Sequence, residues 1–365
     1  MKSIQLRIPG PTPCPPDVLE ATGKQMINHR GPEFAAMVNK ITVRLKEFYQ
    51  TKNDVFILTG SGTGSMEAAI VNVLSPGDKV LSVSNGEFGD RFGSMAGTFG
   101  ANVTKLNFEH GLVVDPDKVK QALQADPGIE AVLVTHNETS TGVTNDLATI
   151  SKIVKGAGKL LIVDGISSVG SIDLPTDAWG CDVVVTGSQK GWMVPPGLAF
   201  ISMSQEAWKA HATARMPRFY WDVTRAKKML EKGQTPWTPA VSIFFALEVA
   251  LEDIAKEGFS NVIARHARVA RKARSDAKSL GLSLLVADES YASNTVTAIK
   301  SPEGVDCSKL LKLLQEEYGV VLSGGQGSLT GKIFRIGHLG WVNEADIAEV
   351  TKALKLALPK VGFKV

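Results

Sequence analysis

Short apolar runs alternate with amphipathic stretches between about residues 55 and 200. Four runs consist mainly of Val, Leu and Ile, at residues 80–83, 131–134, 160–163 and 183–186. Such runs are typical of strands that are buried on both faces of a sheet. Because the stretches between them have helical spacing, the pattern predicts an α/β protein with a mostly parallel, doubly wound sheet.

Two of the intervening helices carry clear end signals. In residues 115–125, Asp115 suits the N-cap position and Pro116 the first helical position. A second helical stretch, residues 145–155, is followed by Gly156 and Gly158, which are typical of a helix end.

The pattern changes after Pro239. A long apolar helix is expected at residues 241–256 and a basic one at residues 261–278, followed by strands near 294–300 and 332–336 and helices at 307–317 and 343–356. We therefore expect an N-terminal arm of residues 1–15, a large domain of residues 16–255 and a smaller α+β domain of residues 256–365.

The basic helix is the one stretch that suggests an anionic partner. Its cations are Arg265, Arg268, Arg271, Lys272, Arg274 and Lys278. Charges at this spacing usually form a solvated helix face, and the whole-chain charge of +3 gives no support to a polyanionic partner. We expect neither nucleic acid nor a membrane as a partner.

Composition narrows the compartment and the chemistry. Hydrophobic residues make up 44% of the 365 residues and charged residues 21%, which is ordinary for a soluble protein. The sequence has no signal-peptide pattern and no apolar run long enough to span a membrane. The three cysteines are scattered, without a CxxC motif or a histidine cluster, so we expect a cytoplasmic protein without a structural metal.

A glycine-rich segment follows the apolar run at residues 55–58 and precedes an apolar helix. Residues 59–67 read Thr-Gly-Ser-Gly-Thr-Gly-Ser-Met-Glu. The glycines would let backbone N–H groups approach an anion, and the helix N-terminus favours negative charge. The segment lacks the Lys-Ser/Thr pair of a Walker loop and, because of Ser65, the third glycine of a dinucleotide fingerprint. It is either a phosphate-binding loop or a turn that binds nothing.

Two charged residues are expected at the carboxyl edge of the sheet. Asp164 ends an apolar run and either holds a cation or caps the next turn. Lys190 follows the run at residues 183–186, and its amine is either used chemically or extended to solvent. Together, an anion-binding loop, an acid and a lysine at one sheet edge match a cofactor that has a phosphate, a ring nitrogen and an aldehyde.

The chain resembles the class V, fold-type I aminotransferases that use pyridoxal phosphate (PLP), in the alanine/serine–glyoxylate (serine–pyruvate) branch. The resemblance covers nearly the whole chain. It rests on motifs that occur in order at residues 9–13, 29–34, 60–64, 74–78, 84–89, 136–142, 163–165, 187–190, 195–197 and 334–340.

The resemblance implies a role for each matching position. Lys190 would form a Schiff base with PLP and then move the substrate's Cα proton, and Asp164 would pair with the ring nitrogen. Phe88 would stack on the ring, where relatives often have Trp, and Thr139 would lie near the phenolic oxygen. The phosphate would be held by Ser61, Gly62, Thr63 and Gln189 of the same chain and by Thr238 and Thr235 of a neighbouring subunit.

The substrate would be held by Arg335, whose guanidinium can pair with a carboxylate, and by the backbone of Pro9 and Gly10. From the residues alone, Arg335 could equally form a surface ion pair, Phe88 could pack in the core, and Thr238 could cap a helix. The implied enzyme is a homodimer with its active site at the subunit interface.

The implied reaction is ping-pong transfer of an amino group from alanine or serine to glyoxylate or pyruvate. A transaminase for phosphonate or phosphoserine substrates stays an alternative, as does a noncatalytic subunit that retains the fold. A cysteine desulfurase would need a catalytic cysteine on a loop of the small domain, but the comparable stretch at residues 323–330 has none. Cys307 lies instead at the start of a predicted helix. A nucleotide-binding oxidoreductase would need the dinucleotide fingerprint.

Overall fold

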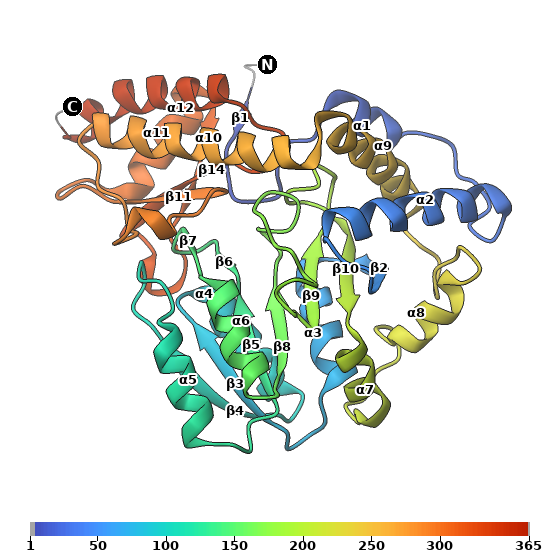
Figure 1. The fold of residues 1–365 in the computed structure, drawn as a ribbon. Coiled ribbons are helices and arrows are strands. Elements are labelled where there is room, and N and C mark those ends of the chain that lie inside the picture. The colour runs from blue at the N-terminus through green and yellow to red at the C-terminus, as the bar shows by residue number, and fades with distance from the viewer. Residues whose placement is uncertain (1–3, 364–365) are drawn as a thin grey trace.

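The computed structural model describes residues 4–363 and is built around one large sheet (Figure 1). Six of its seven strands are parallel and only β10 is antiparallel to its neighbours. The strand order is β2 (Asp54–Gly60), β10 (Gly197–Met203), β9 (Val183–Gly187), β8 (Leu160–Asp164), β5 (Ala131–Thr135), β3 (Lys79–Ser84) and β4 (Asn102–Asn107). The predicted doubly wound α/β sheet is confirmed.

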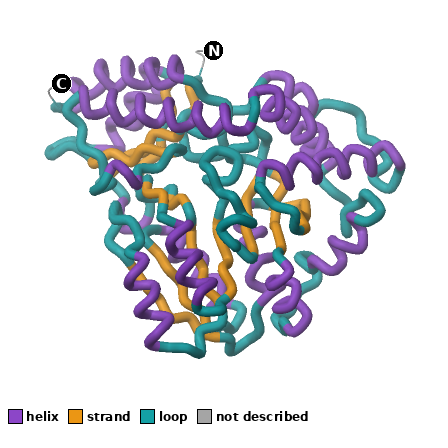
Figure 2. Tube along the Cα trace, in the orientation of Figure 1, coloured by secondary structure: helices purple, strands orange, loops and turns teal. Residues whose placement is uncertain are grey.

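Helices cover both faces of this sheet, as the helix and strand tube in Figure 2 shows. One layer contains α1 (Pro16–Ala21), α2 (Pro32–Phe48), α5 (Pro116–Ala125), α6 (Leu147–Gly156) and α9 (Val241–Glu257). The other contains α3 (Gly62–Val73), α4 (Glu87–Thr98), α7 (Gln205–Thr213) and α8 (Val223–Leu230). Within β8, Leu161 and Val163 join the first apolar cluster and Ile162 the second. The continuous apolar runs thus arise because both faces are buried.

The C-terminal region, residues 259–363, forms a separate apolar cluster above the sheet in Figure 1. A three-stranded antiparallel sheet has the order β11 (Val296–Lys300), β14 (Ile333–Gly337) and β13 (Ser323–Gly324). It packs with α10 (Phe259–Ser279), α11 (Cys307–Tyr318) and α12 (Glu344–Ala357). The expected domain boundary near residue 255 stays a prediction, and the joint between α9 and α10 is at Gly258.

The remaining elements are short. β1 (Gln5–Leu6) pairs in parallel with β12 (Val320–Val321), so the N-terminal arm is attached to the C-terminal region. After β5, the strands β6 (Asn137–Glu138) and β7 (Val143–Thr144) form a hairpin. The C-terminal region also contains three 3₁₀ turns, η1 (Glu289–Tyr291), η2 (Gly327–Leu329) and η3 (Leu358–Val361).

The predicted ends of helices and strands lie within two residues of those in the structure. Asp115 is the N-cap of α5 and accepts the N–H of Asp117. The helix expected from residue 145 instead begins at Leu147, with Asp146 as its N-cap. Asn145 lies outside that helix because its buried side chain bridges neighbouring loops, with its Oδ1 accepting from Asn85 Nδ2 (2.9 Å) and from the Val114 N–H (3.0 Å).

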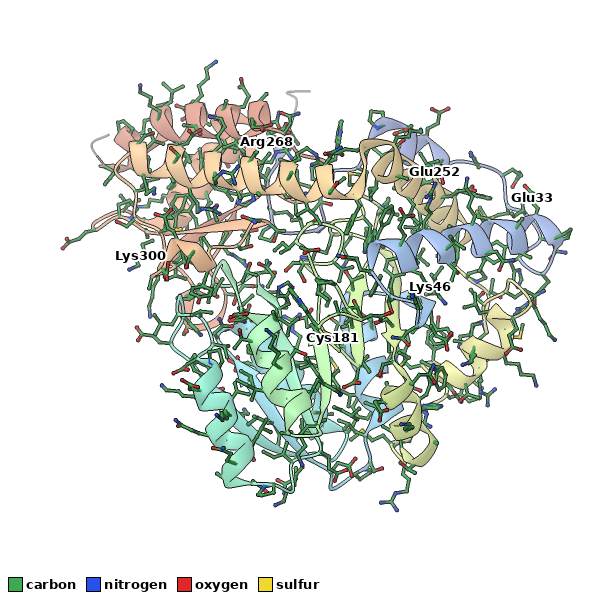
Figure 3. All side chains as sticks on the ribbon, viewed as in Figure 1. Glu33, Lys46, Cys181, Glu252, Arg268 and Lys300 are labelled. Carbon is green, nitrogen blue, oxygen red and sulfur yellow. The ribbon has the colours of Figure 1, made fainter. Side chains whose placement is uncertain are left out.

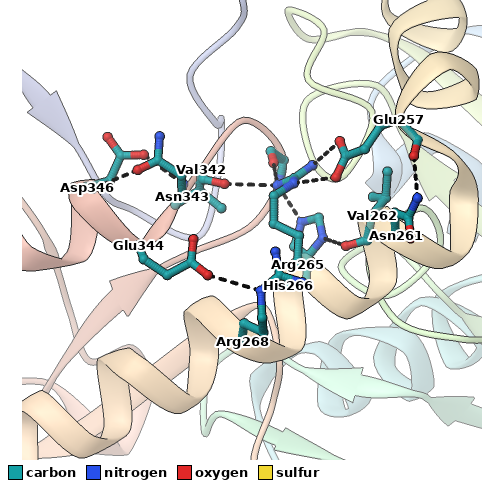
Figure 4. A network of polar contacts seen from close by, with 11 residues as sticks. Glu257, Asn261, Val262, Arg265, His266, Arg268, Val342, Asn343, Glu344 and Asp346 are labelled. Carbon is teal, nitrogen blue, oxygen red and sulfur yellow. Dashed lines mark hydrogen bonds and ion pairs between the residues drawn. The ribbon is translucent and has the colours of Figure 1, made fainter.

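The basic helix α10 is not simply a solvated face. Arg265 pairs with Glu257 and also donates to the carbonyls of Gly340 and Val342 (Figure 4). Arg274 is buried and donates to the Ser293 carbonyl, whereas Arg268 pairs with Glu344 at the surface. Arg265 and Arg274 therefore hold α10 against its neighbours by bonds to backbone carbonyls, and Arg268 and Lys278 add surface ion pairs to α12 and η1.

Charged side chains lie mostly outside the two helical layers, as the sticks in Figure 3 show for Glu33 and Lys46 on α2, whereas Cys181 is inside. Within residues 4–363, no helix is long and apolar enough to cross a bilayer. The same residues contain no group of three metal-binding side chains.

Candidate active site

The glycine-rich segment forms the turn from β2 into α3. Ser61 is the N-cap of α3, and its side chain makes no capping hydrogen bond. The first N–H groups of a helix have no partner inside it, so this end can bind an anion. A Cβ at Gly60 or Gly64 would lie 2.7 Å from Trp221 Cη2. These two glycines are thus required by Trp221, which the sequence argument did not foresee.

Asp164 ends β8 and is buried. Its Oδ1 accepts the N–H of Ile166 (2.9 Å), and its Oδ2 accepts the Thr135 hydroxyl (3.3 Å). Burial raises the pKa of this carboxyl to about 6. Among the described residues it forms no ion pair, so the carboxylate supports the next turn and is stabilised only by these two hydrogen bonds and by the more distant charge of Lys190.

Lys190 lies in the turn after β9 and does not extend to solvent. Its Nζ donates to the carbonyl of Pro9 at 2.6 Å. Burial lowers the pKa of the amine to about 8; the nearby charges of Arg335 and Arg91 act in the same direction, while that of Asp164 opposes them. A Cβ at Gly10 would lie 2.6 Å from this Nζ. The N-terminal arm therefore packs directly on the lysine.

A cavity of about 220 Å³ opens at this amine. Its lining brings together six residues that the sequence singled out: Gly10, Gly62, Thr63, Phe88, Gln189 and Lys190. Gln189 Oε1 is buried without a hydrogen-bond partner. A larger cavity of about 620 Å³ contains none of the predicted residues and lies where β3, β5 and β8 begin. Chemistry, rather than volume, identifies the smaller cavity as the candidate site.

Phe88 and Arg91 both reach this cavity from α4. The Arg91 guanidinium lies 4.8 Å from the centroid of the Phe88 ring. Phe88 is half-buried and belongs to none of the described apolar clusters, so the core-packing interpretation is wrong. Sequence reasoning missed Arg91, although its position three residues after Phe88 places both side chains on one helix face.

Arg335 lies on β14 and is 5% exposed. Its Nε donates to the Gly324 carbonyl (3.0 Å), and its Nη1 donates to the Thr139 carbonyl and to Gln326 Oε1 (both 3.2 Å). It forms no ion pair with any described residue, and burial lowers its pKa to about 10. The surface ion-pair interpretation is therefore wrong. Gln326 was not foreseen, because only the fold brings its loop to Arg335.

Thr139 connects the hairpin to the loop after β8. Its hydroxyl donates to Ser167 Oγ at 2.7 Å, and Ser167 also accepts from Asn137 Nδ2 at 2.8 Å. The structure thus places Thr139 between Arg335 and the loop after Asp164, outside the lining of the cavity.

Thr235 and Thr238 do not line the cavity of their own chain. Thr235 is buried and its hydroxyl donates to the Trp237 carbonyl, whereas Thr238 is exposed. The N-cap of α9 is Ala240 and has no side-chain cap, so Thr238 does not cap that helix.

Known proteins with similar sequences cover almost the whole chain. The "Soluble hydrogenase 42 kDa subunit" of Anabaena cylindrica is 45% identical over 99% of this chain and 94% of its own. The L-aspartate–glyoxylate aminotransferase of Paracoccus denitrificans is 39% identical (98% and 92%), and the serine–glyoxylate aminotransferase of Methylorubrum extorquens 37% (99% and 92%).

Solved structures and the family model agree with these relatives. The alanine–glyoxylate aminotransferase of Nostoc sp. superposes with a TM-score of 0.94 at 32% identity and covers 98% of this chain and 96% of its own. The model of the family "Aminotransferase class-V" matches residues 5–341. The chain therefore belongs to the class V aminotransferases and is a fold-type I transaminase that depends on PLP.

Proposed function

We propose that this enzyme moves the amino group of a small amino acid, alanine or serine, to glyoxylate or pyruvate by a ping-pong mechanism. The observation that carries the proposal is a buried arginine without an ion-pair partner, Arg335, near a half-buried lysine, Lys190, whose pKa is lowered. The guanidinium of Arg335 can bind a carboxylate, and the amine of Lys190 can react with an aldehyde or accept a proton. Relatives named for glyoxylate transamination support the acceptor.

The site fits PLP at both polar ends. Gln189 Oε1 is buried and unpartnered, and Asp164 is a buried carboxylate without a cation. Ser61, Gly62, Thr63 and Gln189 would hold the phosphate at the start of α3. Asp164 would pair with the ring nitrogen, and a cation there would restore the ionised carboxylate that burial disfavours.

The ring would lie against Phe88, with Thr139 near its phenolic oxygen. Lys190 would be the residue that attaches PLP, and the cofactor would supply an electron sink for the charge that develops at the substrate Cα. Phe88 contributes an aromatic surface, with less area than the Trp of many relatives.

Lys190 would move the proton at Cα. Because its pKa is lowered to about 8, about a tenth of the amine is neutral at pH 7, far more than for an ordinary lysine, and this form can accept a proton. The Pro9 carbonyl orients the amine, and the glycine at position 10 leaves room for it, because a Cβ there would collide with the Lys190 side chain.

Arg335 would bind the substrate carboxylate and so orient the Cα–H bond. Its burial makes an unpaired guanidinium costly, and a carboxylate would relieve that cost. The backbone of Pro9 and Gly10 would line the opposite side of the substrate site.

We place the active site at the interface of a homodimer. Thr238 is exposed and lies outside its own cavity, so it is free to reach the phosphate of a partner, and Thr235 would do so from the same loop. The free thiols of Cys14, Cys181 and Cys307 suit a reducing cytoplasm, where we expect the enzyme to act.

The decisive experiment tests donors against acceptors with purified, PLP-loaded protein. Alanine and serine should give the highest kcat/KM with glyoxylate or pyruvate, ahead of aspartate, phosphoserine and aminoethylphosphonate. Preference for aspartate or for a phosphorus-containing donor would overturn the substrate proposal. A protein that develops no visible absorption with PLP and transfers no amino group would instead support the noncatalytic-subunit alternative, to which the hydrogenase name of one relative points.

A further inference from the structure

The first turn of α4 is capped from outside the helix. Its N-cap residue, Gly86, has no side chain that could cap it. The N–H of Glu87 instead donates to Ser140 Oγ (3.0 Å), and those of Phe88 (3.2 Å) and Gly89 (3.1 Å) donate to Glu138 Oε2. Three orphan donors of α4 are thus satisfied by a hairpin about fifty residues further along the chain.

This arrangement differs from that of the locally capped helices of the sheet region. The helices α5, α6 and α7 are capped by the side chains of their own N-cap residues, which are Asp115, Asp146 and Ser204. Local caps stabilise a helix wherever it lies, whereas a distant cap also fixes where the helix lies. The helix that carries Phe88 and Arg91 to the cavity is therefore tied to the hairpin.

Glu138 is fully buried and forms no ion pair with any described residue. Its Oε1 accepts both the N–H (3.0 Å) and the hydroxyl (2.6 Å) of Ser140. Burial raises the pKa of this carboxyl, while the bonds from Ser140, Gly89 and Phe88 lower it. The positive end of the α4 dipole favours the anion at this position.

The close packing explains a glycine. A Cβ at Gly86 would lie 2.6 Å from Glu138 Cδ and 2.4 Å from Ser140 Oγ. Its φ of 173° is open to any residue, so the glycine is needed for the approach of the carboxylate and not for its backbone conformation.

We propose that Glu138 is a positioning residue that, together with Ser140, caps α4 across the fold and thereby fixes Phe88 at the cofactor ring. This inference rests on the proposed role of Phe88. Thr139 follows Glu138 directly, and its carbonyl accepts from Arg335 Nη1. One short hairpin therefore sets both the ring-stacking side chain and the substrate arginine.

The test compares Glu138→Gln with Asp182→Asn. Glutamine keeps the size of Glu138 but presents an NH₂ group to N–H donors. Asp182 is also a buried carboxylate that accepts a backbone N–H, from Leu161, but it is ion-paired with Lys155 and lies far from α4, so Asp182→Asn controls for the loss of a buried charge elsewhere in the fold. Amide hydrogen exchange of the first turn of α4 is measured in cofactor-free protein, and kcat and KM in the PLP-loaded enzyme.

In Glu138→Gln, the first turn of α4 should exchange at least about tenfold faster, and kcat should fall by about 10- to 100-fold with KM changed less than about threefold. The visible circular dichroism of bound PLP should weaken. Asp182→Asn should show none of these changes. Wild-type exchange and kcat in Glu138→Gln, or the same losses in Asp182→Asn, would overturn the proposal.

Ser140→Ala provides a milder variant in case Glu138→Gln does not fold. It removes the acceptor of the Glu87 N–H and leaves the Glu138 carboxylate in place, so exchange should rise about two- to fivefold. Unchanged exchange and unchanged kcat in this variant would also reject the cap. The exchange experiment needs no cofactor, and its outcome is therefore separate from a failure of the proposed transaminase site.

Discussion

The two ends of the central sheet contain the same pair of residue types in opposite arrangements. At one end, the buried carboxylate of Asp182 is paired with Lys155 and accepts the Leu161 N–H. At the other, Asp164 is buried and Lys190 is half-buried, and they form no ion pair with each other. The first carboxylate and amine are paired within the chain and hold a loop in place. The second two have hydrogen bonds but no partner of opposite charge in contact, as expected where a bound molecule supplies the partner.

Substitutions of Lys190 and Lys155 should give the largest difference in activity. Lys190→Ala removes the attachment point and the base, so activity should fall at least about 10³-fold. Lys155→Ala should keep kcat and lose about 2–3 kcal/mol of unfolding free energy, because Asp182 is left buried without its cation. Steady-state kinetics and urea unfolding of both variants measure this contrast. Comparable activity in the two variants would mean that the sheet ends are not functionally distinct.

Substitutions of Asp164 and Asp182 should likewise affect activity in one case and stability in the other, with a smaller loss of activity than for Lys190. Asp164→Asn keeps the shape but removes the charge beside the ring nitrogen, so kcat should fall about 10²- to 10³-fold while PLP stays bound. Asp182→Asn should weaken folding, with kcat retained. Visible absorption reports bound PLP in each case. An Asp164→Asn enzyme with wild-type kcat would exclude the proposed electrostatic role.

Two buried arginines extend the comparison to the C-terminal region. Arg335→Ala should raise KM for amino donors about 100-fold with PLP binding intact, because it removes a charge-assisted pair with the carboxylate. Arg274 is also buried but donates to the Ser293 carbonyl, so Arg274→Ala should lower the melting temperature and leave KM unchanged. If both variants have the wild-type KM, Arg335 does not bind the substrate.

The smallest effect concerns pH. The pKa of Lys190 is lowered from 10.5 to about 8 in the folded, cofactor-free protein, so the unfolded chain binds more protons between these values. Folding stability should therefore rise as pH increases from about 8 towards 10.5, by a slope of one proton at most. Urea unfolding of cofactor-free wild type and Lys190→Ala at several pH values isolates this contribution. Equal slopes in the two proteins would mean that the amine is not perturbed.

The sequence predicted β2, β3, β5, β8 and β9 because each is a short apolar run that is buried on both faces, but it did not single out β10 or the largely exposed edge strand β4. It also located Lys190, Asp164 and the start of α3, which follow such runs directly. It did not predict Gln326 or the cap formed by Glu138, because these contacts join segments far apart in the chain. The contact of Trp221 with the glycines at residues 60 and 64 was not foreseen either, since the side chain of Trp221 cannot be placed without the fold.

The N-terminal arm has a mechanical consequence. Its strand β1 is joined to β12 of the C-terminal region, and the Gly337 N–H donates to the Arg7 carbonyl at 2.7 Å. Two residues after Arg7, the Pro9 carbonyl holds the Lys190 amine. A displacement of the C-terminal region would therefore move the Pro9 carbonyl, which accepts the hydrogen bond of Lys190, because only a few residues separate the two contacts. Removal of residues 5–9 would remove both this connection and the acceptor of the Lys190 amine.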